Sequence, residues 1–240
     1  MARAGIRELP IQEEEHSKLQ RVITSSESKL EHHKDRQSPT PIPCERIAAH
    51  PNFVHLSAIE GLVVDLRYAS ENNFAQRVLY QALDCAWIRR EAALGLQQAI
   101  VFLREHHPRL RLVLLDALRP QRVQEAIWAT LEESPLQAYF ADPIPGSIHS
   151  FGMAVDVSLI DAQGKMIDMG AGYDQMDAMS HPALESIHIA EGKLMPQHVV
   201  HRQWLRDAMS TGGFRGIDTE WWHFDHGDRL IVRRDFPRVL

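Results

Sequence analysis

The chain has 240 residues and a formal net charge of -6 at pH 7, which gives no reason to expect nucleic acid or an anionic membrane as a partner. No apolar run approaches the roughly 18 residues that a membrane span needs, and the first residues lack the apolar segment of a secretory signal. The two cysteines, Cys44 and Cys85, do not make a disulfide framework. We therefore expect a cytoplasmic protein with reduced thiols.

The N-terminal segment 1–42 is polar and mixed in charge, a composition that permits disorder. Glutamates and lysines dominate residues 11–34, which favours a surface helix, and the prolines that follow favour an extended linker. We predict an N-terminal appendage over residues 1–42 and a single globular domain over residues 43–240.

The globular part mixes strands and helices. Strands are predicted, in chain order, over residues 61–69, 110–117, 153–160, 165–169 and 220–224. Helices are predicted over residues 86–107, 121–133 and 198–209, with Pro108 ending the first and Gly212-Gly213 the last. The turn sequence DAQG joins the third and fourth strands, so we expect a hairpin there. Because the elements do not alternate regularly as βαβ units, they favour an α+β fold with a mixed, mainly antiparallel sheet.

The stretch SIHSFGMAVDVSL, residues 147–159, sets His149 and Asp156 among small and apolar residues. A strand over residues 154–159 has one apolar face, while Asp156 lies on the other face, which we expect to be half-buried. A carboxylate in that position costs free energy unless it is paired, hydrogen-bonded or bound to a metal. Gly152 permits a turn that can bring His149 to the same site.

The stretch EWWHF supplies two further candidates, Glu220 and His223. Two imidazoles and one carboxylate suit zinc, and three protein ligands leave a fourth position for water. A carboxylate close to such a water can take its proton and later deliver it to a leaving amine. His149, Asp156 and His223 are therefore candidate ligands. The helix-based HExxH signature of other zinc peptidases is absent from the sequence.

The pattern SxHxxGxxxD followed by EWWHF resembles the VanX-type D-alanyl-D-alanine dipeptidases, within the zinc D,D-peptidases. Four supporting stretches occur in the order of that family, namely DLRYASENNF (65–74), DALRPQRVQ (116–124), DMGAGYDQMD (168–177) and RDFP (234–237). The resemblance spans residues 53–238. It implies a mixed sheet with flanking helices and a zinc site in a small cleft.

The resemblance also implies a role for each candidate residue. One zinc ion per chain would be bound by His149, Asp156 and His223. Glu220 would be the general base and acid. Arg119 would stabilise the negative charge that develops on the attacked carbonyl, since a guanidinium stays protonated. The free amino group of the substrate would be held by Tyr68, Ser147 and Asp174.

Simpler roles remain open for several of these residues. Arg119 can instead be a structural ion-pair partner of Asp116, Asp174 can cap a turn, and Tyr68 can lie at the edge of the core. The chain also departs from the family at two places that we expect near the substrate cavity. Phe151 stands where Arg is common, and residues 75–79 lack the glycine of the family pattern, so the substrate range stays open.

The expected function is zinc-dependent hydrolysis of the dipeptide D-Ala-D-Ala to two D-alanines, with metal-bound water attacking and Glu220 as the base. One alternative is a D,D- or L,D-carboxypeptidase that acts on peptidoglycan stem peptides. A zinc-binding module without catalysis is a further alternative, although a purely structural site would need neither Glu220 nor Arg119. The oligomeric state and the biological role stay open.

Overall fold

The computed structural model describes residues 39–240, so the helix and most of the appendage predicted at the N-terminus lie outside the described residues. The described unit begins at Pro39. Ile42 is buried and forms a parallel β-bridge with Val239 near the C-terminus. The domain therefore includes residues that the sequence analysis assigned to the end of the appendage.

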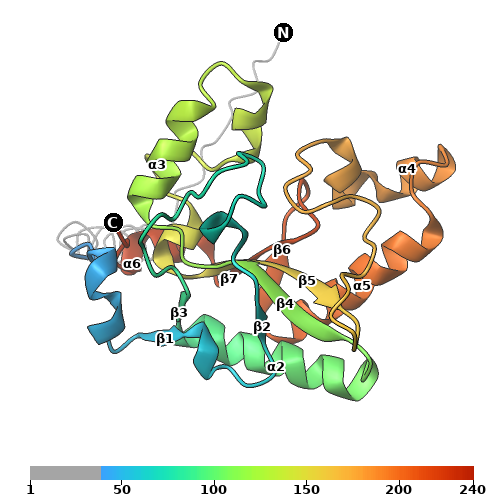
Figure 1. Ribbon diagram of the computed structural model, residues 1–240, viewed down its shortest axis with the longest axis horizontal. Coiled ribbons are helices and arrows are strands. Elements are labelled where there is room, and N and C mark those ends of the chain that lie inside the picture. The colour runs from blue at the N-terminus through green and yellow to red at the C-terminus, as the bar shows by residue number, and fades with distance from the viewer. Residues whose placement is uncertain (1–38) are drawn as a thin grey trace, which may run out of the picture. The chain divides into compact units, whose positions relative to one another are not determined.

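A five-stranded mixed sheet forms the centre of the fold, in the order β2-β4-β5-β7-β6 (Figure 1). In that order its strands are Val63–Val64, Arg111–Asp116, Ala154–Ile160, His223–His226 and Phe214–Gly216. Only β2 and β4 run parallel, and the other neighbours are antiparallel. A separate antiparallel pair is formed by β1 (Phe53–His55) and β3 (Trp87–Arg89). The predicted α+β fold with a mainly antiparallel sheet is confirmed.

Five α-helices accompany the sheet in the described part of the chain: α2 (Arg90–His106), α3 (Gln121–Thr130), α4 (Glu185–Ala190), α5 (Pro196–Thr211) and α6 (Arg229–Asp235). The helices α2 and α5 pack against each other and against strands of the sheet (Figure 1). Glycines permit this close approach, because a Cβ atom added at Gly95 would lie only 2.4 Å from the carbonyl oxygen of Gly212. None of the helices in residues 39–240 combines the length and the apolar character that crossing a membrane requires.

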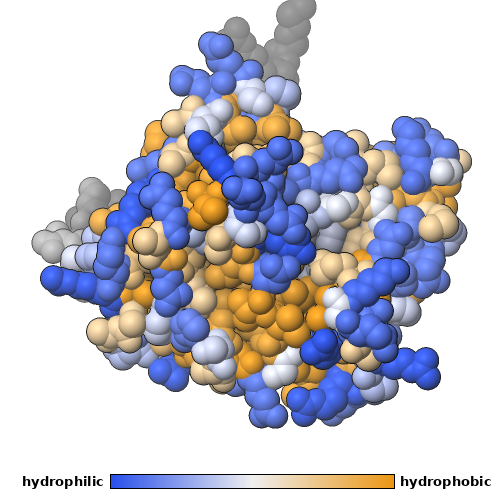
Figure 2. Space-filling view, in the orientation of Figure 1, coloured by the Kyte–Doolittle hydropathy of each residue, from blue (hydrophilic) through white to orange (hydrophobic). Residues whose placement is uncertain are grey.

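Short 3-10 helices fill many of the connections: η1 (Cys44–Ala49), η2 (Leu56–Ala58), η3 (Arg67–Ala69), η4 (Pro135–Tyr139), η5 (Ile148–Phe151), η6 (Ala178–Ser180) and η7 (Pro182–Leu184). The main apolar core unites side chains of α2, α5 and the sheet, and a smaller cluster forms beside α3. Both cysteines are free thiols and buried. Figure 2 shows that apolar residues also gather in the middle of one face, and the edge-strand residue Val64 is 39% exposed.

Three of the predicted elements begin or end clearly elsewhere in the structure. The first helix begins at Arg90 rather than at residue 86, because Trp87–Arg89 pair with β1 and bury Ile88. The predicted strand over residues 61–69 is reduced to β2, since the chain turns into η3 directly after it. The last strand begins at His223 rather than at residue 220. Residue propensities predicted the correct type of element in these cases, but contacts with distant segments determined where each element begins or ends.

The strand β5 is buried along its whole length, so the expectation of one half-buried face is wrong. Neighbouring strands flank β5 on both edges. The face that was expected to be half-buried is covered by an apolar cluster that includes Ile160, and Met166 and Tyr173 pack against this cluster. The predicted hairpin after β5 is reduced to a single bridge between Ile160 and Met166. Asp156 is therefore 2% exposed, so its carboxylate needs partners that offset the free-energy cost of burying a charge.

Candidate metal centre and active site

A tight turn brings His149 next to Asp156, as the sequence predicted. His149 lies in η5, and Gly152 ends this helix with a φ of 67° in the left-handed region. A Cβ atom there would lie 2.7 Å from the ring of Phe53, so both the conformation and the space require glycine. The chain then enters β5, which carries Asp156.

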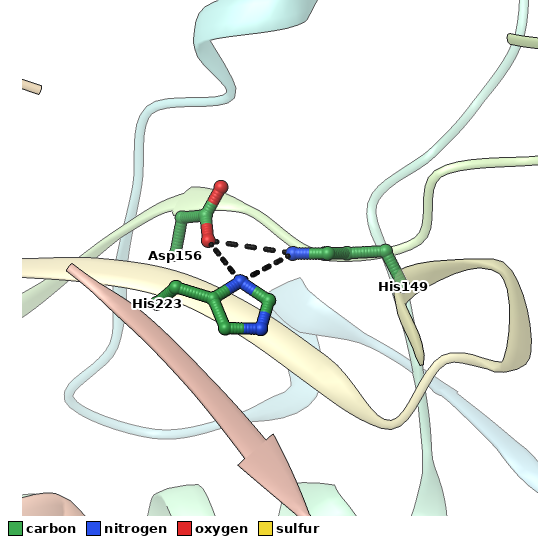
Figure 3. A group of neighbouring side chains, drawn as sticks. All are labelled: His149, Asp156 and His223. Atoms are coloured by element: carbon green, nitrogen blue, oxygen red, sulfur yellow. Dashed lines mark hydrogen bonds and ion pairs between the residues drawn. The ribbon is translucent and has the colours of Figure 1, made fainter. Parts of the chain in front are cut away.

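His223 reaches the same place across the sheet. In the antiparallel register of β5 and β7, Asp156 and His223 are directly opposite each other. Directly opposite residues on adjacent strands have neighbouring side chains on one face. The Nε2 atom of His149 lies 3.1 Å from the Nδ1 atom of His223. The Asp156 Oδ1 atom lies 3.3 Å from the first nitrogen and 3.0 Å from the second (Figure 3). The three side chains thus offer ligand atoms within 4.8 Å of one another.

The outward-facing nitrogen of each imidazole is held by an oxygen. The Nδ1 atom of His149 lies 2.7 Å from the carbonyl oxygen of Ala117, and the Nε2 atom of His223 lies 3.0 Å from Asp225 Oδ1. Carbonyl and carboxylate oxygens accept only, so both rings donate outward and present lone pairs inward in their neutral form. This is the arrangement that orients histidines around a metal.

In the neutral form of both rings, two lone pairs and one carboxylate oxygen converge here, so the cluster requires positive charge from a metal ion or an added proton. The set of two nitrogens and one oxygen fits a divalent metal of the zinc type. The pKa directions agree with this demand for positive charge. Burial lowers the pKa of His223, but Asp225 and Asp156 raise it to about 10. Burial raises the pKa of Asp156, but His149 and His223 hold it well below its usual range.

Arg119 is fixed at the edge of this cluster by a buried network. Its Nε and Nη2 atoms donate to Asp116 Oδ2 at 3.0 and 2.7 Å, and its Nη1 atom donates to Gln124 at 3.1 Å. The other oxygen of Asp116 accepts a hydrogen bond from the hydroxyl of Tyr80. The ion pair between Arg119 and Asp116, which the sequence left open as another role for Arg119, is therefore present. Arg119 Nη2 nevertheless also lies 3.6 Å from Asp156 Oδ2, beside the candidate metal centre.

Glu220 lies in the loop that enters β7 and is half-buried. Among the described residues its carboxylate has no hydrogen-bond or ion-pair partner, although it lines the same cavity as His223. Burial raises the pKa of Glu220 from its ordinary value to about 7. A carboxyl group with that pKa is suited to accept and return a proton near neutral pH.

Asp174, Tyr68 and Ser147 form the other side of the cavity. Asp174 has a φ of 59°, and its carboxylate accepts hydrogen bonds from the Phe74 backbone nitrogen at 3.2 Å and from the Tyr68 hydroxyl at 3.4 Å. Burial and the charge of Asp156 raise the pKa of Asp174 to about 8. Ser147 is 4% exposed and directly precedes η5.

All eight predicted site residues line one cavity of about 210 Å³. The two departures from the family pattern do not: neither Phe151 nor any residue of 75–79 contributes to its wall among the described residues. Phe151 is 1% exposed and belongs to the main core, under the guanidinium of Arg238. These departures therefore do not form the cavity wall, although the backbone nitrogen of Leu79 donates to the carbonyl oxygen of Tyr68, a wall residue, at 2.9 Å.

Several residues of the site were missed by the sequence analysis. Asp225 follows His223 by two positions, and period-two spacing on a strand was the signal that could have placed both on one face. The Tyr173 hydroxyl donates to Asp156 Oδ2 at 3.1 Å, and the sequence analysis named no partner for this tyrosine. Arg229 and Arg233 of α6 also line the cavity, although the sequence analysis predicted no helix there.

Comparisons with known proteins show the family of this chain. The family model of peptidase M15, described as D-Ala-D-Ala dipeptidase, matches residues 50–240. The D-alanyl-D-alanine dipeptidase of Escherichia coli (strain K12) is 35% identical over 164 residues, which are 68% of this chain and 78% of that protein. The Streptomyces coelicolor protein of the same name is 28% identical over 75% of this chain and 94% of its own.

A solved structure of the LdcB LD-carboxypeptidase aligns with a TM-score of 0.44 and 15% identity, over 77% of this chain and 72% of that one, a likeness too weak to bear on function. The family match, in contrast, covers most of the chain and the whole of the candidate site. This chain belongs to the peptidase M15 family of D-Ala-D-Ala dipeptidases and is a metallopeptidase.

Proposed function

We propose that this chain hydrolyses D-Ala-D-Ala to two D-alanines, with one zinc ion held by His149, Asp156 and His223. The observation that carries the proposal is the convergence of three buried acceptor atoms in a cavity that Glu220 and Arg119 also line. The cavity of about 210 Å³ is smaller than the about 300–1,000 Å³ of typical sites for drug-sized ligands, which favours a small substrate. Zinc in such a site lowers the pKa of water and polarises a carbonyl group.

Glu220 transfers a proton from the attacking water to the leaving group. Its carboxylate takes a proton from the attacking water and then donates it to the nitrogen of the leaving D-alanine. The raised pKa of about 7 suits both directions of transfer. The lack of a side-chain partner among the described residues leaves both carboxylate oxygens available for this role.

Arg119 stabilises the negative charge that develops on the carbonyl oxygen of the scissile peptide. Its guanidinium is held by Asp116 and Gln124, so it needs little reorganisation when the charge appears. Burial disfavours the charged guanidinium, but Asp116 and neighbouring groups hold the pKa of Arg119 well above its ordinary value. A permanent positive charge at this point favours the transition state over the ground state, in which the carbonyl oxygen carries no net charge.

Asp174, Tyr68 and Ser147 hold the free amino group of the dipeptide. The carboxylate of Asp174 is half-buried, and desolvation raises its pKa to about 8, which an ammonium group of the substrate would lower again. Tyr68 keeps its hydroxyl proton because burial raises its pKa well above the ordinary value, so it stays a hydrogen-bond donor. Together these groups select a substrate whose amino group is free.

The substrate class is tested by comparing free D-Ala-D-Ala with a peptidoglycan stem pentapeptide that ends in D-Ala-D-Ala. Metal-loaded protein should release D-alanine from the dipeptide with a far higher kcat/KM. Preferential release of the terminal D-alanine from the pentapeptide would instead establish a carboxypeptidase.

A further inference from the structure

Arg233 is a cation of the active-site cavity that forms no ion pair with a carboxylate of residues 39–240. It projects from α6 and lines the same cavity as the candidate metal ligands. Its Nε atom donates to the carbonyl oxygen of Gly146 at 3.0 Å. In residues 39–240 it has no carboxylate oxygen within 4 Å, whereas the two other arginines of the cavity, Arg119 and Arg229, are paired with Asp116 and Asp225.

The surroundings of Arg233 add positive charge. Burial lowers its pKa, and so do Arg229 and Arg238. The negative charge that acts on Arg233 comes from Asp225, but that carboxylate already binds His223 and Arg229. A half-buried guanidinium with cationic neighbours, whose Nη groups have no hydrogen-bond acceptor among residues 39–240, is a site that an anionic group would stabilise.

The position of the guanidinium is fixed by the segment that leads into the metal centre. Gly146 directly precedes Ser147 and η5, the helix that carries His149. The hydrogen bond from Arg233 therefore ties α6 to the segment that positions a candidate ligand. A guanidinium that is already held by one hydrogen bond loses less entropy when its other nitrogens bind a ligand.

The cavity thus has groups for two opposite charges. Asp174 and Tyr68 offer acceptors and a hydroxyl for an ammonium group, and Arg233 offers two free Nη groups. A free dipeptide carries one charge of each sign at its two ends. We propose that Arg233 binds the C-terminal carboxylate of the substrate and so makes a free carboxyl end a condition for tight binding. This inference rests on the proposed dipeptidase function and adds a specificity-determining residue to it.

The test compares D-Ala-D-Ala with its C-terminal amide in wild-type, Arg233→Met and Arg233→Lys proteins, all metal-loaded. Arg234→Met is the matched control, because Arg234 lies on the same helix but pairs with Asp235 and does not line the cavity. Loss of a charge-assisted hydrogen bond should raise KM for the free acid by about tenfold to a hundredfold in Arg233→Met. The kcat value and the KM for the amide should change little, and Arg233→Lys should recover part of the loss.

A second experiment measures substrate binding in the absence of turnover. Titration calorimetry of the metal-loaded Glu220→Gln protein, with and without Arg233→Met, gives the Kd of the acid and of the amide. The acid should lose affinity in the double variant while the amide does not. Equal changes for acid and amide, or none for either, would overturn the role of Arg233. Absence of turnover in the wild type would instead count against the proposed function. The titration would still show whether Arg233 binds the carboxylate.

Discussion

The Nε2 atom of His149 and the Nδ1 atom of His223 face each other at 3.1 Å, each on a ring whose other nitrogen is bound to an acceptor. Two neutral imidazoles in this arrangement would oppose lone pairs, with the carboxylate of Asp156 beside them. The protein can hold this geometry only with a cation, either a metal ion or an added proton. The direction of the His223 pKa agrees with this, because Asp225 and Asp156 raise it above its ordinary value despite burial.

Replacement of Glu220 separates catalysis from metal binding. Glu220→Gln keeps the volume but removes the group that accepts the proton, so kcat should fall by about 10²–10⁴. Bound metal, measured by atomic emission after gel filtration, should stay at the wild-type level, since Glu220 is not among the three converging ligands. Turnover comparable to that of the wild type would remove Glu220 from the mechanism.

Asp225 should control metal affinity through His223. Asp225→Asn removes the charge that orients the ring and holds its outward N–H, and loss of such a partner lowers metal affinity by about 10–100-fold. Competition with a chromogenic chelator measures this change. Asp218→Asn is the control, because Asp218 is exposed and precedes the same strand. Unchanged affinity in Asp225→Asn would show that the hydrogen bond does not support the metal site.

The buried pair of Asp116 and Arg119 should matter for both stability and rate. Asp116→Asn leaves the guanidinium of Arg119 partly uncompensated, which typically costs about 3–5 kcal/mol of unfolding free energy. Denaturant titration measures this loss, and kcat should also fall because Arg119 is less well fixed. Glu45→Gln, which breaks the exposed pair with Arg122, should change stability far less. Similar losses in the two variants would argue against a special role for the buried pair.

The pH dependence of kcat/KM should show an ascending limb on the acid side. The base must be ionised, so activity is lost as pH falls through the pKa of Glu220, which burial raises to about 7. A bound metal adds positive charge that lowers this pKa, so the midpoint should lie between the ordinary carboxyl value and about 7. Profiles recorded with saturating metal test this. In Glu220→Gln the limb should vanish, and its persistence there would assign it to another group.

The sequence indicated His149, Asp156, Glu220 and His223 because they lie in two short motifs whose chemistry is local, whereas the other site residues followed from the family resemblance. The turn at Gly152 and the alternation along β5 follow from residue type and spacing, and they bring His149 and Asp156 together. All eight predicted residues line one cavity, while their individual roles stay predictions. The same alternation along a strand could have predicted Asp225 as a site residue, since it lies two residues after His223.

The rest of the fold depends on contacts between distant segments. Trp87–Arg89 looked like the first turn of a helix, but they pair with Phe53–His55, which no local pattern could reveal. Arg233 enters the cavity because α6 packs against the segment around Gly146, far away in the sequence. Phe151 looked like a change in the cavity, but it lies in the core. Tertiary packing decided each of these positions.

The most direct test of the proposed activity is release of D-alanine from D-Ala-D-Ala by purified, zinc-loaded protein, with L-Ala-L-Ala as the comparison and a chelator as the control. Only the D,D dipeptide should be cleaved, the chelator should abolish the activity, and added zinc should restore it. Zinc bound at about one ion per chain without any cleavage of D-Ala-D-Ala would contradict it.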